Sequence, residues 1–255
     1  MKIYLLDHNV DMAVAWAKYF FKETDVHIVC DDFANFMKEH LTIDGIVSPG
    51  NSFGLMDGGY DKAITNYFGK WLMRDVQKAI LEYFGGEQSV GTCLTMTTPI
   101  TNMVDDKILL LHTPTMRTPE KIYDIRVIYQ CMREALIAAK HSNRTEIVIP
   151  AFGAGTGGVP YDDVARMMFL AYKQIKNPLR VCKAQSNLWD DDWQTPFSKV
   201  EFDKIVLPFC VKKEKSQNNN RQLIYVSSAR IPHHQILKKI KGDIGGNEVK
   251  WEQID

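Results

Sequence analysis

The chain has 255 residues, of which 45% are hydrophobic, so it can bury one large core with an extension, or at most two small domains. Lysine plus arginine and aspartate plus glutamate each number 31, which excludes a general attraction to nucleic acid or to an anionic membrane. No apolar run approaches the ~20 residues that cross a bilayer, and the five cysteines are far apart, unlike those of a disulfide scaffold or a metal site. These properties predict a soluble, cytoplasmic protein with reduced thiols.

Apolar strand-like runs alternate along the chain with segments of helical period, which is the pattern of a layered α/β fold. Strands are predicted at residues 3–6, 26–30, 45–47, 91–97, 108–112, 147–149 and 204–210. Helices are predicted at residues 12–21, 61–68, 71–84, 120–141 and 161–176. We therefore expect an α/β domain over residues 1–212, interrupted by an irregular insert at about 177–202.

The end of the chain differs in composition from the rest. Residues 212–221 are polar and of low complexity, and a strand candidate at 223–226 and a basic stretch at 233–241 follow them. We expect residues 213–255 to form a polar linker and a C-terminal extension. Three aspartates between Trp189 and Trp193, inside the insert, are of a type that binds hard cations, but their composition favours a solvated acidic loop, and we assign no metal site there.

Two glycine-rich segments each join a predicted strand to a predicted helix. Residues 48–64 read SPGNSFGLMDGGYDKAI, and residues 150–160 read PAFGAGTGGVP. Backbone amides at such a junction, together with the N-terminus of the helix, can hold a phosphate group. In an open α/β sheet, ligands bind beyond the carboxyl ends of the strands. Two such loops suggest two phosphates, although tight turns alone would also use some of these glycines.

The first segment resembles a signature of the macro domains, a family that binds ADP-ribose and related NAD-derived nucleotides. The family sequence reads roughly Asn-Ala-Ala-Asn, a glycine-rich stretch, then Gly-Val-Asp-Gly-(Ala/Cys)-Ile, and this chain keeps its length without a gap. By that match Asn51 is the last asparagine of the signature, Gly58 and Gly59 are its last glycines, and Asp61 is the acidic residue of the hydrolytic members. The resemblance implies a three-layer α/β/α mixed sheet with a C-terminal extension.

The second segment resembles the family's Pro-Ala-Ile-Ser-Thr-Gly-Ile-(Tyr/Phe)-Gly-Tyr-Pro, again at equal length. The identical residues are Pro150, Ala151, Gly155, Gly158 and Pro160. Together, the two loops give the following expected ligand-binding residues: Gly58, Gly59, Tyr60, Gly153, Ala154, Gly155, Thr156, Gly157 and Gly158.

The candidate catalytic residues are Asn51 and Asp61. The amide of Asn51 can fix the hydroxyls of the distal ribose, and the carboxylate of Asp61 can orient a water molecule. In hydrolytic macro domains the residue that matches Asp61 helps to activate water without an obligatory metal, so the resemblance implies neither metal nor cofactor. A helix N-terminal acid that stabilises the helix dipole is the alternative role for Asp61.

Adenine recognition in the family uses an aspartate at the end of an earlier strand. Asp32 and Phe33 stand at that position here, and Asp7, at the end of the first strand, is the rival acceptor. The chain departs from the family at Gly157, where many members have an aromatic residue against the distal ribose, so a wider pocket is expected.

Other departures lie near the same predicted pocket. Asp57 replaces the first glycine of a triplet, which adds a carboxylate to the ligand path, and Lys62 replaces a later glycine. Asp57 and Arg117 are further candidate ligand residues, and the alternative for Arg117 is a solvated position between two prolines.

Three functions follow as hypotheses. The chain hydrolyses ADP-ribosyl adducts, or it is a non-catalytic module that senses or sequesters ADP-ribose or an NAD-derived signalling nucleotide, or its tail docks a partner. In each of the first two, the expected partner is ADP-ribose or an ADP-ribosylated substrate, and no membrane is involved.

Overall fold

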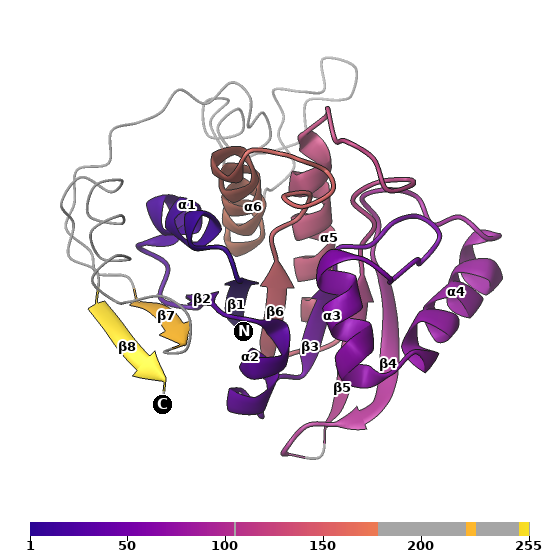
Figure 1. The fold of residues 1–255 in the computed structure, drawn as a ribbon, viewed down its shortest axis with the longest axis horizontal. Coiled ribbons are helices and arrows are strands. Elements are labelled where there is room, and N and C mark those ends of the chain that lie inside the picture. Colours follow the sequence, from indigo (N-terminus) through magenta and orange to yellow (C-terminus); the bar gives the residue numbers. More distant parts are fainter. Residues whose placement is uncertain (105, 178–222, 228–249, 255) are drawn as a thin grey trace, which may run out of the picture.

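The computed structural model describes residues 1–104, 106–177, 223–227 and 250–254, and within them eight strands form one sheet in the order β4-β5-β3-β6-β1-β2-β7-β8 (Figure 1). The strands are β1 Lys2–Asp7, β2 Val26–Cys30, β3 Gly45–Ser48, β4 Leu94–Thr101, β5 Lys107–His112, β6 Glu146–Pro150, β7 Leu223–Ser227 and β8 Lys250–Ile254. Only β4, which pairs with β5, runs antiparallel to its neighbour. The predicted mixed α/β sheet is therefore confirmed.

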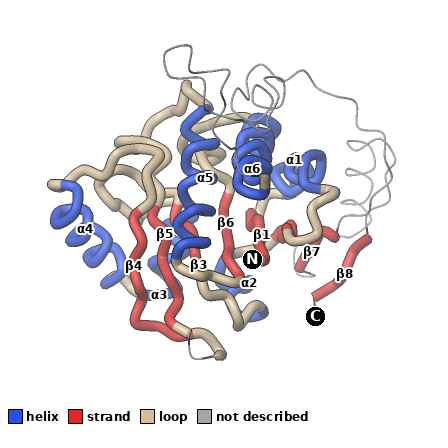
Figure 2. The backbone as a smooth tube through the Cα atoms, turned by 180° about the vertical axis from the view of Figure 1, so that it is seen from behind, coloured by secondary structure: helices blue, strands red, loops and turns tan. Residues whose placement is uncertain are grey.

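Helices cover both faces of this sheet. They are α1 Val10–Phe20, α2 Phe33–Glu39, α3 Gly59–Phe68, α4 Trp71–Phe84, α5 Arg126–His141 and α6 Tyr161–Lys176. Helices α1, α5 and α6 lie on one face of the sheet, and α2, α3 and α4 lie on the opposite face (Figure 2). Each group of helices shares one buried cluster with the sheet. This gives three layers, α/β/α. Among the described residues, no helix combines the length and apolarity that crossing a bilayer requires.

Alternation along the central strands explains why the sheet has two cores. In β1, Ile3 and Leu5 belong to the cluster with α1, α5 and α6, whereas Tyr4 and Leu6 belong to the other cluster. Successive side chains of a strand point to opposite faces. A parallel strand covered on both faces therefore needs a continuous apolar run, which is how β1 reads in the sequence.

Two helices differ from the sequence-based expectation. Helix α2 was not predicted, because its seven residues are too few to show a clear period. Helix α5 begins at Arg126 rather than at residue 120. The Ile122 amide instead donates to the Gly157 carbonyl, and the Asp124 carboxylate accepts the Arg126 amide. One tertiary hydrogen bond and one local hydrogen bond thus hold residues 120–125 outside the helix.

The described part of the predicted extension continues the sheet. Strand β7, which confirms the candidate at 223–226, pairs in parallel with β2, and β8, which was not predicted, pairs with β7. The predicted strand at 204–210, the insert after residue 177, the polar segment and the basic stretch lie outside the described residues. The boundary at residue 212 stays a prediction.

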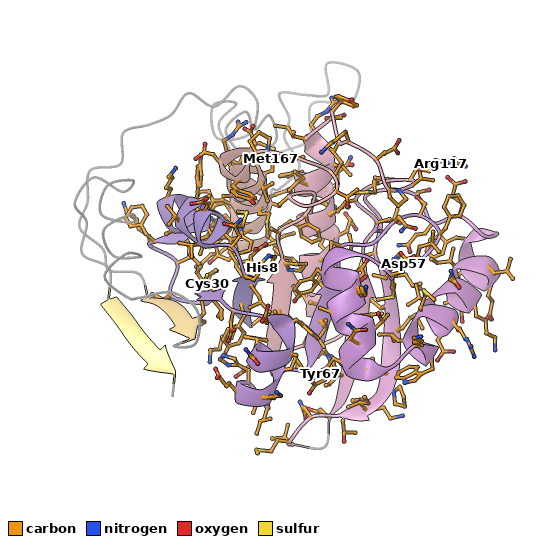
Figure 3. All side chains as sticks on the ribbon, viewed as in Figure 1. His8, Cys30, Asp57, Tyr67, Arg117 and Met167 are labelled. Carbon is orange, nitrogen blue, oxygen red and sulfur yellow. The ribbon has the colours of Figure 1, made fainter. Side chains whose placement is uncertain are left out.

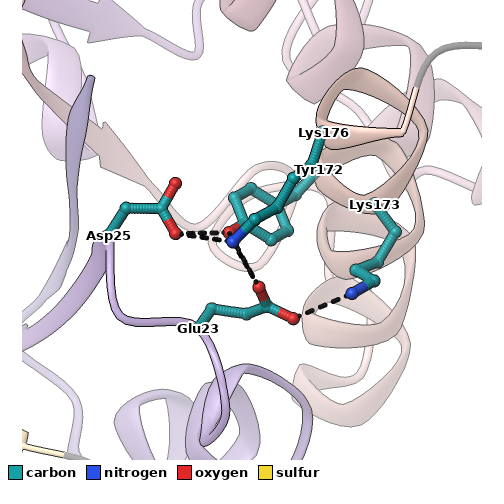
Figure 4. Close-up of polar contacts among 5 residues, drawn as sticks. All are labelled: Glu23, Asp25, Tyr172, Lys173 and Lys176. Atoms are coloured by element: carbon teal, nitrogen blue, oxygen red, sulfur yellow. Dashed lines mark hydrogen bonds and ion pairs between the residues drawn. The ribbon is translucent and has the colours of Figure 1, made fainter.

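A polar cluster fixes the last turns of α6 to the connection between α1 and β2 (Figure 4). The Tyr172 hydroxyl donates to Asp25 at 2.5 Å, and Glu23 accepts from Lys173 at 3.0 Å and from Lys176 at 2.8 Å. Burial would raise the pKa of Glu23, but the hydrogen bonds from Lys176, Lys173 and Tyr172 outweigh it and lower that pKa. The cluster holds α6 in place along the sheet, and with it the glycine loop that precedes the helix.

We expect Glu23→Gln to lower the free energy of unfolding by about 1–3 kcal/mol at pH 7, since hydrogen bonds to a half-buried charged group are lost. The folded-state pKa of Glu23 is lowered, so this contribution is present above the unfolded-state pKa and disappears as the pH falls through the folded-state pKa. Urea denaturation across acidic and neutral pH measures the effect. Exposed Glu82 on α4 provides the control substitution, Glu82→Gln, and an equal loss in both variants would contradict the assignment.

Candidate functional site

A cleft of about 580 Å³ lies at the carboxyl ends of the parallel strands. Its volume is within the range typical of small-molecule sites. The lining residues come from five strand ends and the loops that follow them: Asp7 and His8 at β1, Asp31 to Phe33 at β2, several residues between 49 and 63 at β3, Thr115, Met116 and Pro119 at β5, and several residues between 150 and 157 at β6. This is the edge at which a doubly covered α/β sheet binds ligands.

The order of the strands determines the order in which the lining residues lie along the cleft. Strand β6 is central, with β1 and β2 on one side and β3 and β5 on the other. Figure 3 shows the same arrangement, with His8 over β1 and Asp57 toward α4. The residues predicted to contact the adenine base, the diphosphate and the distal ribose of a bound nucleotide therefore follow one another along the edge of the sheet.

The loop after β6 presents an open stretch of backbone at Gly155. An ideal Cβ atom at Gly155 has no neighbour within 4 Å, and the residue lines the cleft. The flanking residues Gly153 and Gly158 have φ values of +71° and +65°, which L side chains rarely adopt. The loop closes through a hydrogen bond from the Val159 amide to the Gly153 carbonyl, 3.1 Å long, and leads directly into α6. Exposed backbone at Gly155 thus lies shortly before the N-terminus of α6, an arrangement of the kind that can bind an anion.

Gly157 lines the cleft, but its backbone is closely surrounded on the side where a side chain would begin. A Cβ atom there would lie 2.5 Å from the Gly153 carbonyl oxygen and 2.7 Å from Ile122 Cδ1. No side chain fits at Gly157, because the neighbouring backbone and Ile122 already fill its space. Of the six residues predicted from this loop, Gly158 is the one that does not line the cleft.

Asn51 shapes the first glycine loop. Its Oδ1 accepts the amides of Phe53 and Leu55, at 3.1 and 3.3 Å, and its Nδ2 donates to the Leu55 carbonyl at 3.0 Å. The side chain is buried and still borders the cleft. A carboxamide has two N–H donors, so one remains for a ligand beyond the contacts of the described residues. Its role in positioning the loop was not predicted.

Asp61 lies in the first turn of α3, borders the cleft and is only 6% exposed. Its Oδ1 accepts a hydrogen bond of 2.7 Å from the Ser48 hydroxyl at the end of β3. Burial raises the pKa of the Asp61 carboxyl to about 7, although the Ser48 hydrogen bond lowers it. A carboxyl group with this pKa exchanges protons near neutral pH, which a general base must do. The first-turn position is equally compatible with a role in helix stabilisation.

Tyr60 was predicted as a ligand residue, but the sequence did not show where its hydroxyl lies. That hydroxyl is buried and has no hydrogen-bond partner among the described residues. Burial, together with the carboxylates of Asp7 and Asp61, raises the pKa of Tyr60 far above its ordinary value. The ring packs edge-on against Phe33, with 5.3 Å between centroids. Tyr60 thus links the first glycine loop to the β2 end of the cleft.

The two candidate hydrogen-bond acceptors for the adenine base, Asp7 and Asp32, both line the cleft. Asp32 is half-buried at the N-cap of α2, next to the buried ring of Phe33. Asp7 accepts the Asn9 amide at 2.8 Å. Burial raises the pKa of Asp7, although that hydrogen bond and nearby His8 lower it. The choice between Asp7 and Asp32 stays open.

Arg117 lies outside the residues that line the cleft, contrary to its candidate role. Its guanidinium makes two hydrogen bonds to Glu87, of 2.7 and 2.9 Å, and lies 5.3 Å from the ring centroid of Phe53. Its neighbour Met116 lines the cleft instead. Met116 pairs with Asn51 in an isolated β-bridge, a contact across 65 positions of the chain that the sequence gives no means of predicting.

Fully buried His112 supports the first glycine loop from below. Its Nδ1 lies 2.8 Å from Gln88 Oε1, and burial lowers its pKa to about 4, so the ring is neutral. A Cβ atom at Gly50 would lie 2.2 Å from His112 Nε2, so only glycine fits over the ring. In the part of the chain that the structure describes, no three His, Cys, Asp or Glu side chains are grouped so as to hold a metal ion.

Comparison with known proteins identifies the class. The sequence model of the Macro domain family matches residues 47–168. An uncharacterized protein of Aquifex aeolicus (strain VF5) is 32% identical over 126 residues, which are 49% of this chain and 70% of that protein. The chain belongs to the macro domain family, whose members are known to bind ADP-ribose.

Solved structures of macrodomains are also similar. The Oceanobacillus iheyensis macrodomain with MES bound is 23% identical, with 52% of this chain and 70% of that chain covered and a TM-score of 0.45. The macrodomain of Mycobacterium tuberculosis DarG is 19% identical, with coverage of 52% and 84% and a TM-score of 0.45. Thermosipho africanus DarTG in complex with ADP-ribose is 17% identical, with coverage of 52% and 36% and a TM-score of 0.45.

Proposed function

We propose that this protein binds ADP-ribose, or a related NAD-derived nucleotide, in the cleft and hydrolyses ADP-ribosyl adducts with Asp61 as the general base. The observation that carries the proposal is the pairing of an open glycine loop with a buried carboxyl group of pKa about 7 in one cleft. Family membership supports the nucleotide, and the position of Asp61 supports the chemistry.

In this proposal the ligand lies along the edge of the sheet. Its diphosphate accepts hydrogen bonds from the amides around Gly155 at the N-terminus of α6. The adenine lies toward β1 and β2, where Asp7 and Asp32 offer acceptors beside Phe33. The distal ribose lies toward β3 and β5, near Asn51.

The proposed reaction is a metal-independent hydrolysis. Asp61 removes a proton from a water molecule, and the water oxygen attacks the carbon that carries the adduct. The bond to the leaving group breaks, its electron pair stays with the leaving group, and that group takes up a proton. The carboxylate form of Asp61 is populated near pH 7 because its pKa is raised to that range.

A non-catalytic module that senses or sequesters the nucleotide is the second candidate. It is favoured by the hydrogen bonds that tie Asn51 to its own loop and Asp61 to Ser48, since both residues then have structural roles. Tight binding of the ground state is sufficient for sequestration, whereas catalysis needs stronger interactions in the transition state. Calorimetry with ADP-ribose, followed by incubation with an ADP-ribosylated protein, separates the two. Binding without release of ADP-ribose would favour the module.

We expect Asp32→Ala to weaken ADP-ribose binding by about 1–3 kcal/mol, because a hydrogen bond between the base and a charged group is lost. Calorimetric titration of the variant measures the loss. Asp7→Ala is the matched variant, since Asp7 lines the same end of the cleft. If Asp7→Ala has this effect and Asp32→Ala does not, adenine is recognised by Asp7 at the end of β1 rather than by Asp32 after β2.

A further inference from the structure

The charged side chains that line the cleft are almost all of one sign. They are Asp7, Asp31, Asp32, Asp57 and Asp61, and the other titratable residues that line it in the described part of the chain are His8 and Tyr60. Among the described residues, no lysine or arginine lines the cleft. A nucleotide diphosphate brings two further negative charges into this space, so its own charge is poorly matched by the side chains around it.

The nearby basic side chains do not correct this imbalance. Arg117 is bound to Glu87 outside the cleft. Lys121 contacts the outer side of the second glycine loop, with its Nζ 2.6 Å from the place of a Gly158 Cβ atom. Exposed Lys62 follows Asp61 on α3 but does not line the cleft. Within the described chain, the diphosphate is thus left to the backbone amides alone.

The aspartates of the cleft differ in the hydrogen bonds that they already accept and in their exposure to solvent. Asp31 accepts hydrogen bonds from the Asp32 amide and from Asn35. Asp61 is bound to Ser48, and burial raises its pKa to about 7, whereas Asp57 is exposed on the first glycine loop. Asp57 is therefore the carboxylate of the cleft most accessible to a bound ligand.

The β3 and β5 end of the cleft combines this carboxylate with apolar surface. Asp57 and Leu55 come from the loop after β3, and Met116 and Pro119 come from the segment after β5. A carboxylate together with a thioether and a proline ring suits a flat group that is both cationic and partly apolar. In the proposed function the distal ribose lies at this β3 and β5 end, so the group in question is a substituent of that ribose.

We propose that the cleft selects a nucleotide diphosphate whose distal ribose carries a planar cation, with Asp57 supplying the opposite charge and Met116 and Pro119 the apolar surface. The inference rests on the proposed function and names its substrate class. Two ligands share this chemistry: the pyridinium ring of intact NAD⁺ and the guanidinium group of arginine-linked ADP-ribose. In this proposal the ligand itself supplies the positive charge.

NAD⁺ and NADH provide a matched pair of probes, because they differ mainly in the charge and planarity of the nicotinamide ring. We expect the full-length protein to bind NAD⁺ about three- to fivefold more tightly than NADH, the range of a single exposed ion pair. Calorimetric titration at about 0.05 M salt measures both affinities, and the ratio should approach one at about 0.5 M salt.

The variants test whether Asp57 causes the preference. Asp57→Asn should bring the NAD⁺ to NADH affinity ratio to about one. Asp75→Asn, at an exposed position on α4 outside the cleft, should keep the wild-type ratio. Titration with an arginine-linked and a serine-linked ADP-ribosyl peptide then distinguishes the two sources of the cation.

Each remaining outcome has a defined meaning. Equal affinities for NAD⁺ and NADH, with ADP-ribose still bound, would overturn the charge selection and leave the proposed function intact. Failure to bind ADP-ribose would instead overturn the proposed function. If Mg²⁺ raises the ADP-ribose affinity about tenfold and abolishes the NAD⁺ preference, the positive charge comes from a metal and the inference is wrong.

Discussion

Replacing Gly155 with glutamate is expected to lower the affinity for ADP-ribose by about 100-fold or more while the fold stays intact. The backbone of Gly155 does not have a positive φ, and an ideal Cβ atom there meets nothing within 4 Å. The glutamate side chain can therefore be accommodated, but it must enter the open cleft. A carboxylate in the path of the diphosphate adds both steric overlap and like-charge repulsion. Calorimetry measures the affinity, and circular dichroism with thermal unfolding checks the fold.

The matched control is Gly155→Ala. A single methyl group fits in the same open space without charge, so we expect affinity within about threefold of the wild type. Gly157 is unsuitable for such a test, because its Cβ atom would meet the Gly153 carbonyl oxygen at 2.5 Å and disturb the loop itself. Retained affinity in a folded Gly155→Glu variant would reject the phosphate site.

The second large effect is expected for Asp61→Asn, which should lower turnover by about 100-fold or more and change ADP-ribose affinity little. The asparagine oxygen can still accept the Ser48 hydrogen bond of 2.7 Å, and the side-chain size is kept. Only the ability to take a proton from water is lost. Single-turnover release of ADP-ribose from a modified protein measures the rate. A fully active variant would contradict the mechanism and leave nucleotide binding unaffected.

The pKa of Asp61 gives this prediction a pH dependence. Wild-type turnover should rise as the pH increases through about 7, because the carboxylate form is the base.

Stability should change in the opposite direction. The folded-state pKa is raised, so the contribution of this group is fully present below its unfolded-state pKa and is lost as the pH rises through about 7. Asp61→Asn should therefore be more stable than the wild type above pH 7, by an amount on the order of a few kcal/mol. Urea denaturation at several pH values measures it.

Local patterns in the sequence were sufficient to predict the layered α/β fold. Successive side chains of β1 point to opposite faces of the sheet, and helices cover both faces, so the middle positions of the strand are buried. Such a strand appears in the sequence as a continuous apolar run. The glycine loops at 48–64 and 150–160 were readable for a similar reason, since each marks a strand end where the backbone needs freedom or close approach. Two positive φ values, at Gly153 and Gly158, agree with that reading.

The tertiary structure decided which of the predicted side chains reach the cleft. Arg117 pairs with Glu87, 30 positions earlier in the chain, and Ile122 fills the space beside Gly157, 35 positions later. Asn51 is largely committed to its own loop, and the pKa of Asp61 depends on burial that no local pattern reports. The sequence by itself determined where the glycine loops follow the strand ends, because glycine spacing and strand ends are local properties. Charge pairing, side-chain packing and desolvation act between distant segments, so only the folded chain determined them.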